Sequence, residues 1–552
     1  MKGIKIGLLA LLIFASSCKS TETAQKSSSK KPFVWEAANV YFLLTDRFYD
    51  GNASKTIYLD RTKETGKLRG FEGGNLKGVI KKMKEGYFED LGINAIWMTP
   101  LVEQIHEGTD EGTGFSYGFH GYWAKDWTRL DPNFGTEADL AELVKLAHSK
   151  GIRIILDGVV NHTGPVTPKD PVWPDEWVRT SPQCVYQTYE NTISCTLVKN
   201  LPDVKTESEA NVSLPPALVE KWKKEGRYES EIASLDKFFK ETGYPRAPKY
   251  YIIKWLADYV LKYGIDGYRA DTAKHTEEDV WMALKNSCSP AFEQWKKQNP
   301  KDVLDDNPFY MIGEVYNYSI HDGRQFKFSD KTVDYFANGF DNLINFSFKG
   351  DANKPYEELF SQYNNYLQNQ LKGKSVLNYV SSHDDGGPFD KQRKKPYESA
   401  TKLLLCPGIA QIYYGDETAR PLDIPGTQGD ATLRSFMNWN DLKENKATQD
   451  IYAHWKKLAN FRKNHTAVGA GVHQKISSKN GYFFKRTYQK NNIKDVVVVG
   501  LDLNEGSKEI PVDSAFAEGT KVRDTYSGQT TVIKNGVAVI DSNFKIVLLE
   551  AL

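Results

Sequence analysis

Eight short apolar runs alternate with helix-like stretches along most of this chain, and they constrain its fold more than any other feature. Buried parallel strands are nearly continuous apolar runs, and their alternation with helices is typical of βαβ units. Eight such units predict an α/β fold built on a (β/α)8 TIM barrel. The runs lie at residues 40–45, 93–98, 153–160, 265–270, 309–315, 342–348, 375–380 and 410–414.

Two further stretches do not fit the barrel pattern. Roughly 90 residues, rich in Pro, Thr, Asn and Asp, separate the third run from the helix-like stretch at 250–263, which is too long for a structureless loop. After residue 465 short alternating runs with turn residues between them predict an antiparallel β domain. We therefore expect four parts: the first part of the barrel at 33–162, an inserted domain B at 163–248, the second part of the barrel at 249–464, and a C-terminal antiparallel β-sandwich domain at 465–552.

The first 18 residues predict export. A basic start at Lys2 precedes a short apolar run at 6–14, which is too short to cross a membrane. Small residues then lead to Cys18, as in a bacterial lipoprotein signal peptide, so we expect lipidation of Cys18 and a flexible tether at 19–32. The protein would then be held on a membrane, facing the periplasm or the cell surface. A plain signal peptide is the alternative, because Ala15 replaces the usual Leu.

The remaining cysteines fall into two groups. Cys184 and Cys195 lie close together in a turn-rich stretch, and an exported protein can keep disulfides, so we expect these two to pair. Cys288 and Cys406 lie in helix-like or apolar surroundings and are expected to be buried thiols.

Acidic and histidine side chains stand at the ends of four of the apolar runs. Catalytic residues of a TIM barrel lie at the carboxyl ends of its strands. One such carboxylate could be a helix cap or a salt-bridge partner, but four runs that end this way favour an active site. The side chains are those of Asp157, Asn161 and His162; Arg269 and Asp271; Glu314; and His383 and Asp384.

Converging carboxylates are what glycoside hydrolysis needs. A retaining glycosidase uses a nucleophile and an acid/base whose carboxyl groups are about 5–5.5 Å apart. A neighbouring carboxylate raises the pKa of the acid, and a nearby arginine such as Arg269 keeps a nucleophilic aspartate ionised. Ionised carboxylates also stabilise the positive charge that develops on the sugar.

Four ordered segments of the chain resemble those of glycoside hydrolase family 13, the α-amylase family. They are DGVVNH at 157–162, GYRADTAKH at 267–275, IGEV at 312–315 and SSHD at 381–384. The resemblance implies retaining, endo-type hydrolysis of α-1,4 bonds in starch and maltooligosaccharides. It implies Asp271 as nucleophile, Glu314 as acid/base and Asp384 as the carboxylate that holds and distorts the sugar.

The same resemblance implies the substrate contacts. HGYW at 120–123 is similar to a family segment whose tyrosine stacks on the sugar, and Lys274 and His275 match a pair on the leaving-group side. The implied contact residues are His120, Tyr122, His162, Arg269, Lys274, His275 and His383.

Several positions bear on the branch of the family. The family usually has Asn where this chain has Ser382, but SSHD and LPDVKTES at 201–208 resemble bacterial periplasmic α-amylases, and Thr272 resembles α-1,4-acting members. A cyclomaltodextrinase, a neopullulanase or a transglycosylating relative is the alternative. A non-catalytic glucan-binding lipoprotein is less favoured, because all three carboxylates are present. We expect a monomer, and the net charge of +1 offers no electrostatic case for nucleic acid.

Calcium is the cofactor that the resemblance implies. Asn161, Asp203 and the backbone carbonyl of His275 would bind one Ca²⁺ between domain B and the barrel. The histidines lack zinc spacing, and HExxH is absent from the sequence. A second calcium site is an open alternative to an ordinary Asx-Gly turn. Its residues would be Asp50, Asn52, Gly73 and Asn75.

Overall fold

The computed structural model describes residues 32–490 and 492–552. The predicted signal peptide with Cys18, and residues 19–31 of the predicted tether, lie outside the described residues. Within the described ranges no helix combines the length and the apolarity needed to cross a membrane.

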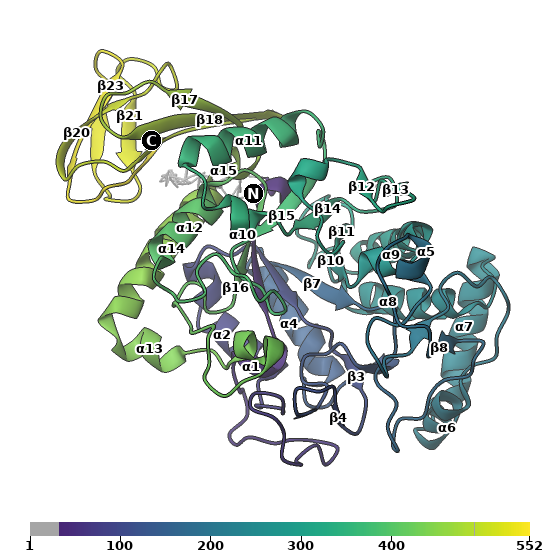
Figure 1. The fold of residues 1–552 in the computed structure, drawn as a ribbon. Helices are drawn as coiled ribbons and strands as arrows, with labels where there is room; N and C mark the ends of the chain where they lie inside the picture. The colour runs from purple at the N-terminus through teal and green to yellow at the C-terminus, as the bar shows by residue number, and fades with distance from the viewer. Residues whose placement is uncertain (1–31, 491) are drawn as a thin grey trace, which may run out of the picture. The chain divides into compact units, whose positions relative to one another are not determined.

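Eight parallel strands close into a barrel in the order β1-β16-β15-β14-β11-β10-β7-β2 (Figure 1). Each strand lies within or next to one of the eight apolar runs, so the TIM-barrel prediction is confirmed. All of the strands except β16 are shorter than their runs, because the runs continue into buried loops. Their bounds are β1 Asn39–Leu43, β2 Ala95–Met98, β7 Arg153–Gly158, β10 Gly267–Ala270, β11 Tyr310–Gly313, β14 Asn342–Asn345, β15 Ser375–Tyr379 and β16 Ile409–Tyr413.

Helices alternate with these strands. Thr136 and Asp139 form a capping box at the start of α4, and Gly264 in a left-handed conformation (φ 72°) ends α8. The long helices are α2 Leu76–Lys84, α4 Glu137–Ser149, α8 Pro248–Tyr263, α9 Glu278–Gln298, α11 Tyr356–Gln368, α12 Pro396–Leu405 and α14 Lys446–Asn464. Short helical turns are η1 Trp35–Ala37, α1 Thr45–Phe48, α3 Tyr87–Asp90, η2 Ala273–His275, η3 Ile320–Asp322, α10 Phe348–Asp351, η4 Gly429–Arg434, α13 Trp439–Glu444 and α15 Thr466–Ala470.

The segment between β7 and α8 has secondary structure of its own. It holds β8 Val178–Arg179, α5 Glu190–Ile193, β9 Asp203–Val204, α6 Pro216–Lys224 and α7 Tyr228–Thr242. The indoles of Trp177 and Trp222, both from this segment, pack on Trp255 of α8 at centroid distances of 6.4 and 6.2 Å. Aromatic burial of this kind fixes the inserted segment to the barrel.

Smaller hairpins decorate the loops at the strand ends. β3 Val102–Gln104 pairs with β6 Ala124–Leu130, and β4 Thr109–Asp110 pairs with β5 Phe115–Ser116. β12 Phe326–Lys327 pairs with β13 Thr332–Val333 in the loop after β11.

The C-terminal region is antiparallel, as predicted. Six strands form one sheet and two form another, with a separate apolar core that includes Ile510, Val522 and Ile540. The six-stranded sheet holds β17 Val472–Ile476, β18 Tyr482–Lys490, β19 Ile493–Leu501, β24 Val547–Ala551, β21 Lys521–Asp524 and β22 Thr530–Val532. The second sheet pairs β20 Gly506–Pro511 with β23 Val537–Ser542.

Candidate active site

A cleft of about 1250 Å³ lies at the carboxyl ends of the barrel strands. The three predicted catalytic carboxylates line it. So do five of the seven predicted contact residues, namely His120, Tyr122, His162, His275 and His383. The exceptions are Arg269, which is buried beneath the carboxylates, and Lys274.

Arg269 of β10 holds the acidic residues together. Its Nη1 donates to Asp271 Oδ1 at 2.6 Å and to Asp157 Oδ1 at 2.8 Å, and its Nη2 lies 2.7 Å from Glu314 Oε1. The arginine side chain is only 1 % exposed. A buried guanidinium that contacts three carboxylates restricts both their positions and their charges.

The turn after β10 binds the carboxylate of Glu314. Thr272 has a left-handed backbone (φ 47°), and its N–H donates to Glu314 Oε2 at 2.8 Å. Burial and the negative charges of Asp271 and Asp384 raise the pKa of Glu314 well above its ordinary value, and these effects exceed the opposing effect of Arg269. A carboxyl group that keeps its proton is suited to act as a general acid.

Asp157, which the sequence placed at the end of a strand without a role, lies behind the nucleophile. Tyr122 Oη and Trp97 Nε1 donate to its Oδ2 at 2.8 and 3.2 Å. Burial raises the pKa of Asp157 to about 7, although Arg269 lowers it. Asp157 therefore fixes Tyr122 and Arg269 from below the cleft.

The remaining carboxylate, Asp384, is the most accessible of the three, with its side chain 35 % exposed. The neighbouring imidazole of His383 stacks on the ring of Tyr122 at 5.4 Å between centroids. Burial lowers the pKa of His120, His162 and His383. These histidines are therefore neutral near pH 7 and can donate and accept hydrogen bonds to a sugar.

Two exposed aromatic rings that the sequence did not single out lie near Lys274, and one of them, Tyr316, lines the cleft. Lys274 Nζ lies 5.2 Å from the ring centroid of Tyr316 and 6.0 Å from that of Tyr186. Tyr186 belongs to the loop closed by the Cys184–Cys195 disulfide, which confirms the predicted pairing. Cys288 and Cys406 are buried free thiols, also as predicted.

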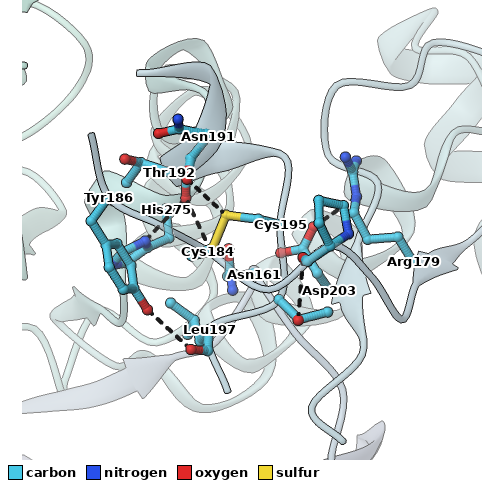
Figure 2. The surroundings of a disulfide bond; sticks show 12 residues. Asn161, Arg179, Cys184, Tyr186, Asn191, Thr192, Cys195, Leu197, Asp203 and His275 are labelled. Carbon is cyan, nitrogen blue, oxygen red and sulfur yellow. Dashed lines mark hydrogen bonds and ion pairs between the residues drawn. A yellow bond between two sulfur atoms is a disulfide. The ribbon is translucent and has the colours of Figure 1, made fainter. Parts of the chain in front are cut away.

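Figure 2 shows that the loop closed by the disulfide lies beside His275. Thr192 in this loop accepts a hydrogen bond from His275 Nδ1 at 3.1 Å, and the Tyr186 hydroxyl donates to the carbonyl of Leu197 at 3.0 Å. Burial lowers the pKa of His275 to about 4. The loop thus holds the ring of His275 at the edge of the cleft.

The predicted calcium residues lie together on the other side of His275 (Figure 2). The amide of Asn161 faces Asp203 Oδ1 and the carbonyl oxygen of His275. If the amide nitrogen of Asn161 faced these two oxygens, it would donate to Asp203 Oδ1 at 3.3 Å and to the His275 carbonyl at 2.5 Å. With its oxygen facing them, three oxygens converge, which is the kind of ligand set that Ca²⁺ takes.

Two other observations bear on this site. The second oxygen of Asp203 lies 3.0 Å from Arg179 Nε, so only one carboxylate oxygen is left for an ion. Over residues 32–490 and 492–552, no group of three or more His, Cys, Asp or Glu side chains could hold a metal. A calcium site here therefore depends on the amide and backbone oxygens, and the three residues fit such a site.

The residues of the possible second calcium site are also adjacent. Asn75 Nδ2 donates to Asp50 Oδ1 at 3.1 Å and to the carbonyl of Gly73 at 2.9 Å, and the N–H of Asn52 donates to the same Asp50 oxygen at 2.8 Å. Asn75 also caps α2. Hydrogen bonds within the loop already satisfy these oxygens, and the second site stays a prediction.

The other end of the cleft is lined by charged residues that the sequence analysis missed. They include Arg69, Asp110, Glu111, Asp430 and Arg434. Asp430 and Arg434 follow the eighth strand four residues apart, a signal that could have marked them. Arg69 and Glu111 lie in loops with no motif, and only the folded chain brings them to the cleft.

Known proteins are similar to this chain in sequence. The model of the family "Alpha amylase, catalytic domain" matches residues 42–422. The periplasmic α-amylase of Escherichia coli K12 is 34% identical over 533 residues, which cover 85% of this chain and 73% of that protein. A cyclomaltodextrin glucanotransferase of Geobacillus stearothermophilus is 26% identical over 513 residues, 90% of this chain and 63% of that longer enzyme.

Solved structures share the fold. The α-amylase of Anoxybacillus superposes with a TM-score of 0.63 at 22% identity, over 94% of this chain and 99% of that one. The cyclomaltodextrin glucanotransferase CldA superposes with a TM-score of 0.62 at 21% identity, over 93% and 99%. With the barrel, the cleft and the sequence matches together, the chain belongs to glycoside hydrolase family 13, the α-amylase family.

Proposed function

We propose that this protein is an α-amylase that hydrolyses α-1,4-glucosidic bonds of starch and maltooligosaccharides with retention, through Asp271, Glu314 and Asp384. The observation that carries the proposal is the shared guanidinium of Arg269. Because one buried cation contacts both Asp271 and Glu314, the two carboxyl groups lie within a few ångströms of each other, as a retaining pair must.

The reaction would take two steps. In the first, protonated Glu314 donates its proton to the glucosidic oxygen while Asp271 attacks the anomeric carbon, so that the C–O bond breaks and a glycosyl ester forms. In the second, ionised Glu314 takes a proton from water, the water oxygen attacks the anomeric carbon, and Asp271 leaves. Asp384 would hold the sugar ring through its hydroxyl groups and stabilise the positive charge.

Substrate contacts would follow the walls of the cleft. Tyr122, held by its hydrogen bond to Asp157, would stack on the sugar at the cleaved bond, with His120, His162 and His383 around it. Lys274 and His275 would contact glucose units of the leaving group.

We further propose that Asn161, Asp203 and the His275 carbonyl bind Ca²⁺, which would cross-link the inserted domain at 163–248 to the barrel. The match to a periplasmic enzyme supports export, and Cys18 would carry a lipid anchor. A transglycosylating activity is the second candidate, because exposed Tyr186 and Tyr316 could hold an acceptor sugar where water would otherwise react.

Asp271→Asn tests the assignment of the nucleophile. The variant should lose several orders of magnitude in kcat on amylose but still bind maltooligosaccharides. Asp236→Asn, which changes an exposed carboxylate of α7, is the matched control and should keep full activity. Unimpaired turnover by Asp271→Asn would overturn the proposal. In the wild type, the ratio of hydrolysis products to transfer products would decide between hydrolysis and transglycosylation.

A further inference from the structure

Three segments that touch one another line the cleft on the side where Arg434 contacts His383. We call them the end wall, residues 66–69, 109–114 and 425–430. Lys67 Nζ donates to the carbonyl of Pro425 at 2.7 Å, and Arg69 Nη2 donates to that of Gln428 at 2.9 Å. The N–H of Gly66 donates to the carbonyl of Phe115, beside the β4–β5 hairpin tip, at 2.9 Å. Side chains and backbone therefore join segments that are far apart in sequence.

Glycines let the three segments approach closely. A Cβ atom on Gly429 would lie 3.3 Å from Arg69 Nη2 and 3.7 Å from Thr113 Cγ2. A Cβ atom on Gly114 would lie 3.1 Å from Gly66 Cα. Both Gly429 and Gly114 have positive φ angles, 59° and 98°, so a side chain there would also strain the backbone. Contacts this close leave no passage for a sugar chain between the hairpin tip and the 425–430 loop.

The end wall is rigidly connected to the catalytic centre. Asp430 accepts from Arg434 Nη2 at 2.5 Å and lies 3.4 Å from Arg69 Nη2. Arg434 Nε in turn donates to the carbonyl of His383 at 2.9 Å, next to Asp384. Paired charges thus connect the wall to the residue that precedes Asp384.

Glu111 differs from its neighbours at the wall. Glu111 is exposed and lines the cleft. Among the described residues none donates a hydrogen bond to its carboxylate or forms an ion pair with it, whereas Arg69, Asp430 and Arg434 pair with one another. The first glucose unit of an α-1,4-glucan has a free 4-hydroxyl, while every later unit uses that oxygen in a glucosidic bond. An unpaired carboxylate at a closed end can accept a hydrogen bond from that hydroxyl.

We infer that the end wall limits how many glucose units fit before the cleaved bond, and that Glu111 recognises the non-reducing end of the glucan. Cleavage is then exo-type, counted from the non-reducing end, in place of the endo-type cleavage that the sequence predicts, and it releases short products of narrow length. The inference rests on the proposed function, because that function makes the wall side the glycone side.

The test uses maltooligosaccharides of four to eight glucose units labelled at the reducing end. With wild type, the labelled fragment should lengthen by one unit for each unit added to the substrate, because the unlabelled product stays constant. Glu111→Gln should raise KM for these substrates about tenfold, because a neutral amide oxygen accepts a weaker hydrogen bond than a carboxylate does. Glu107→Gln is the matched control, since Glu107 lies in the same loop region, pairs with Lys63 and does not line the cleft.

A variant that lacks residues 111–113 should open the wall and release longer, less uniform products while it still cleaves glucan. Labelled fragments of constant length, or scattered cleavage that neither variant changes, would overturn the inference. Equal KM values for Glu111→Gln and Glu107→Gln would remove the role of Glu111. If the wild-type protein cleaved no α-1,4 bond at all, the proposed function would fail instead, so the two failures are distinguishable.

Discussion

Arg269 contacts Glu314 directly, with Nη2 2.7 Å from Oε1, although Arg269 lies on β10, two residues before Asp271, and Glu314 directly follows the neighbouring strand β11. The cation that pairs with the proposed nucleophile therefore also opposes protonation of the proposed acid. Burial and the charges of Asp271 and Asp384 exceed that opposition and still raise the pKa of Glu314. The balance among these groups sets the protonation states that catalysis needs.

Arg269→Lys should lower kcat on amylose by roughly 10²- to 10³-fold. An ammonium group keeps the charge but cannot reproduce the two-nitrogen contact with Asp271 and Glu314, and the expected decrease corresponds to about 3–4 kcal/mol of lost transition-state stabilisation. Steady-state kinetics measures the effect, with circular dichroism to confirm folding. A folded Arg269→Lys enzyme with nearly normal kcat would contradict the shared-guanidinium argument.

The pH dependence of kcat/KM should have an alkaline limb that reports Glu314. The acid must be protonated, so activity is lost as pH rises through its raised pKa. Asp384→Asn removes one of the negative charges that raise the pKa of Glu314. The alkaline limb in the kcat/KM profile of this weakly active variant should therefore move to lower pH. Asp236→Asn should leave the limb in place. A limb that stays or moves to higher pH in Asp384→Asn would contradict the assignment.

The barrel could be predicted because each buried parallel strand needs a continuous apolar run, and the sequence contains all eight runs. Asp271 and Glu314 could be predicted because they directly follow β10 and β11. The strand ends were less predictable: the run at 153–160 continues past Gly158, since the loop after β7 is also buried.

The rest of the site depends on contacts between distant segments. Nothing near Glu111 indicates that its hairpin meets Gly429, because the two are joined only by folding. The carbonyl of Thr192 reaches His275 because a disulfide closes the loop that contains Thr192. Every residue has a backbone carbonyl, so a sequence motif cannot indicate this contact. Asp157 was visible as an acidic strand residue, but its role in holding Tyr122 required the geometry.

Calcium should stabilise the protein against unfolding, and chelation should remove that effect. At a calcium concentration about 100 times the Kd, the gain is roughly 2.7 kcal/mol. Asn161→Ala should abolish the difference between the melting temperatures with calcium and with chelator, while Asp50→Asn should preserve it if the first site alone binds. Isothermal titration gives the number of ions. A calcium response unchanged in Asn161→Ala would exclude the proposed ligand set.

Removing the disulfide should weaken substrate binding more than turnover. Without the Cys184–Cys195 link the loop regains chain entropy, so the Thr192 carbonyl holds the ring of His275 less firmly and Tyr186 loses its fixed place beside Lys274. None of the three proposed catalytic carboxylates lies in this loop. Cys184→Ser/Cys195→Ser should therefore raise KM for long maltooligosaccharides severalfold with kcat nearly unchanged.

The same variant should also bind calcium more weakly, because His275 would supply its carbonyl to the ion from a less constrained backbone. Calcium titration of the oxidised wild type, the reduced wild type and the double variant measures this coupling without any activity assay. Cys288→Ala, which removes a buried free thiol of α9, controls for the loss of a cysteine elsewhere. If KM and the calcium Kd both match those of Cys288→Ala, the disulfide serves only the local stability of its loop; a rise in both would make it a positioning element for the leaving-group side of the cleft.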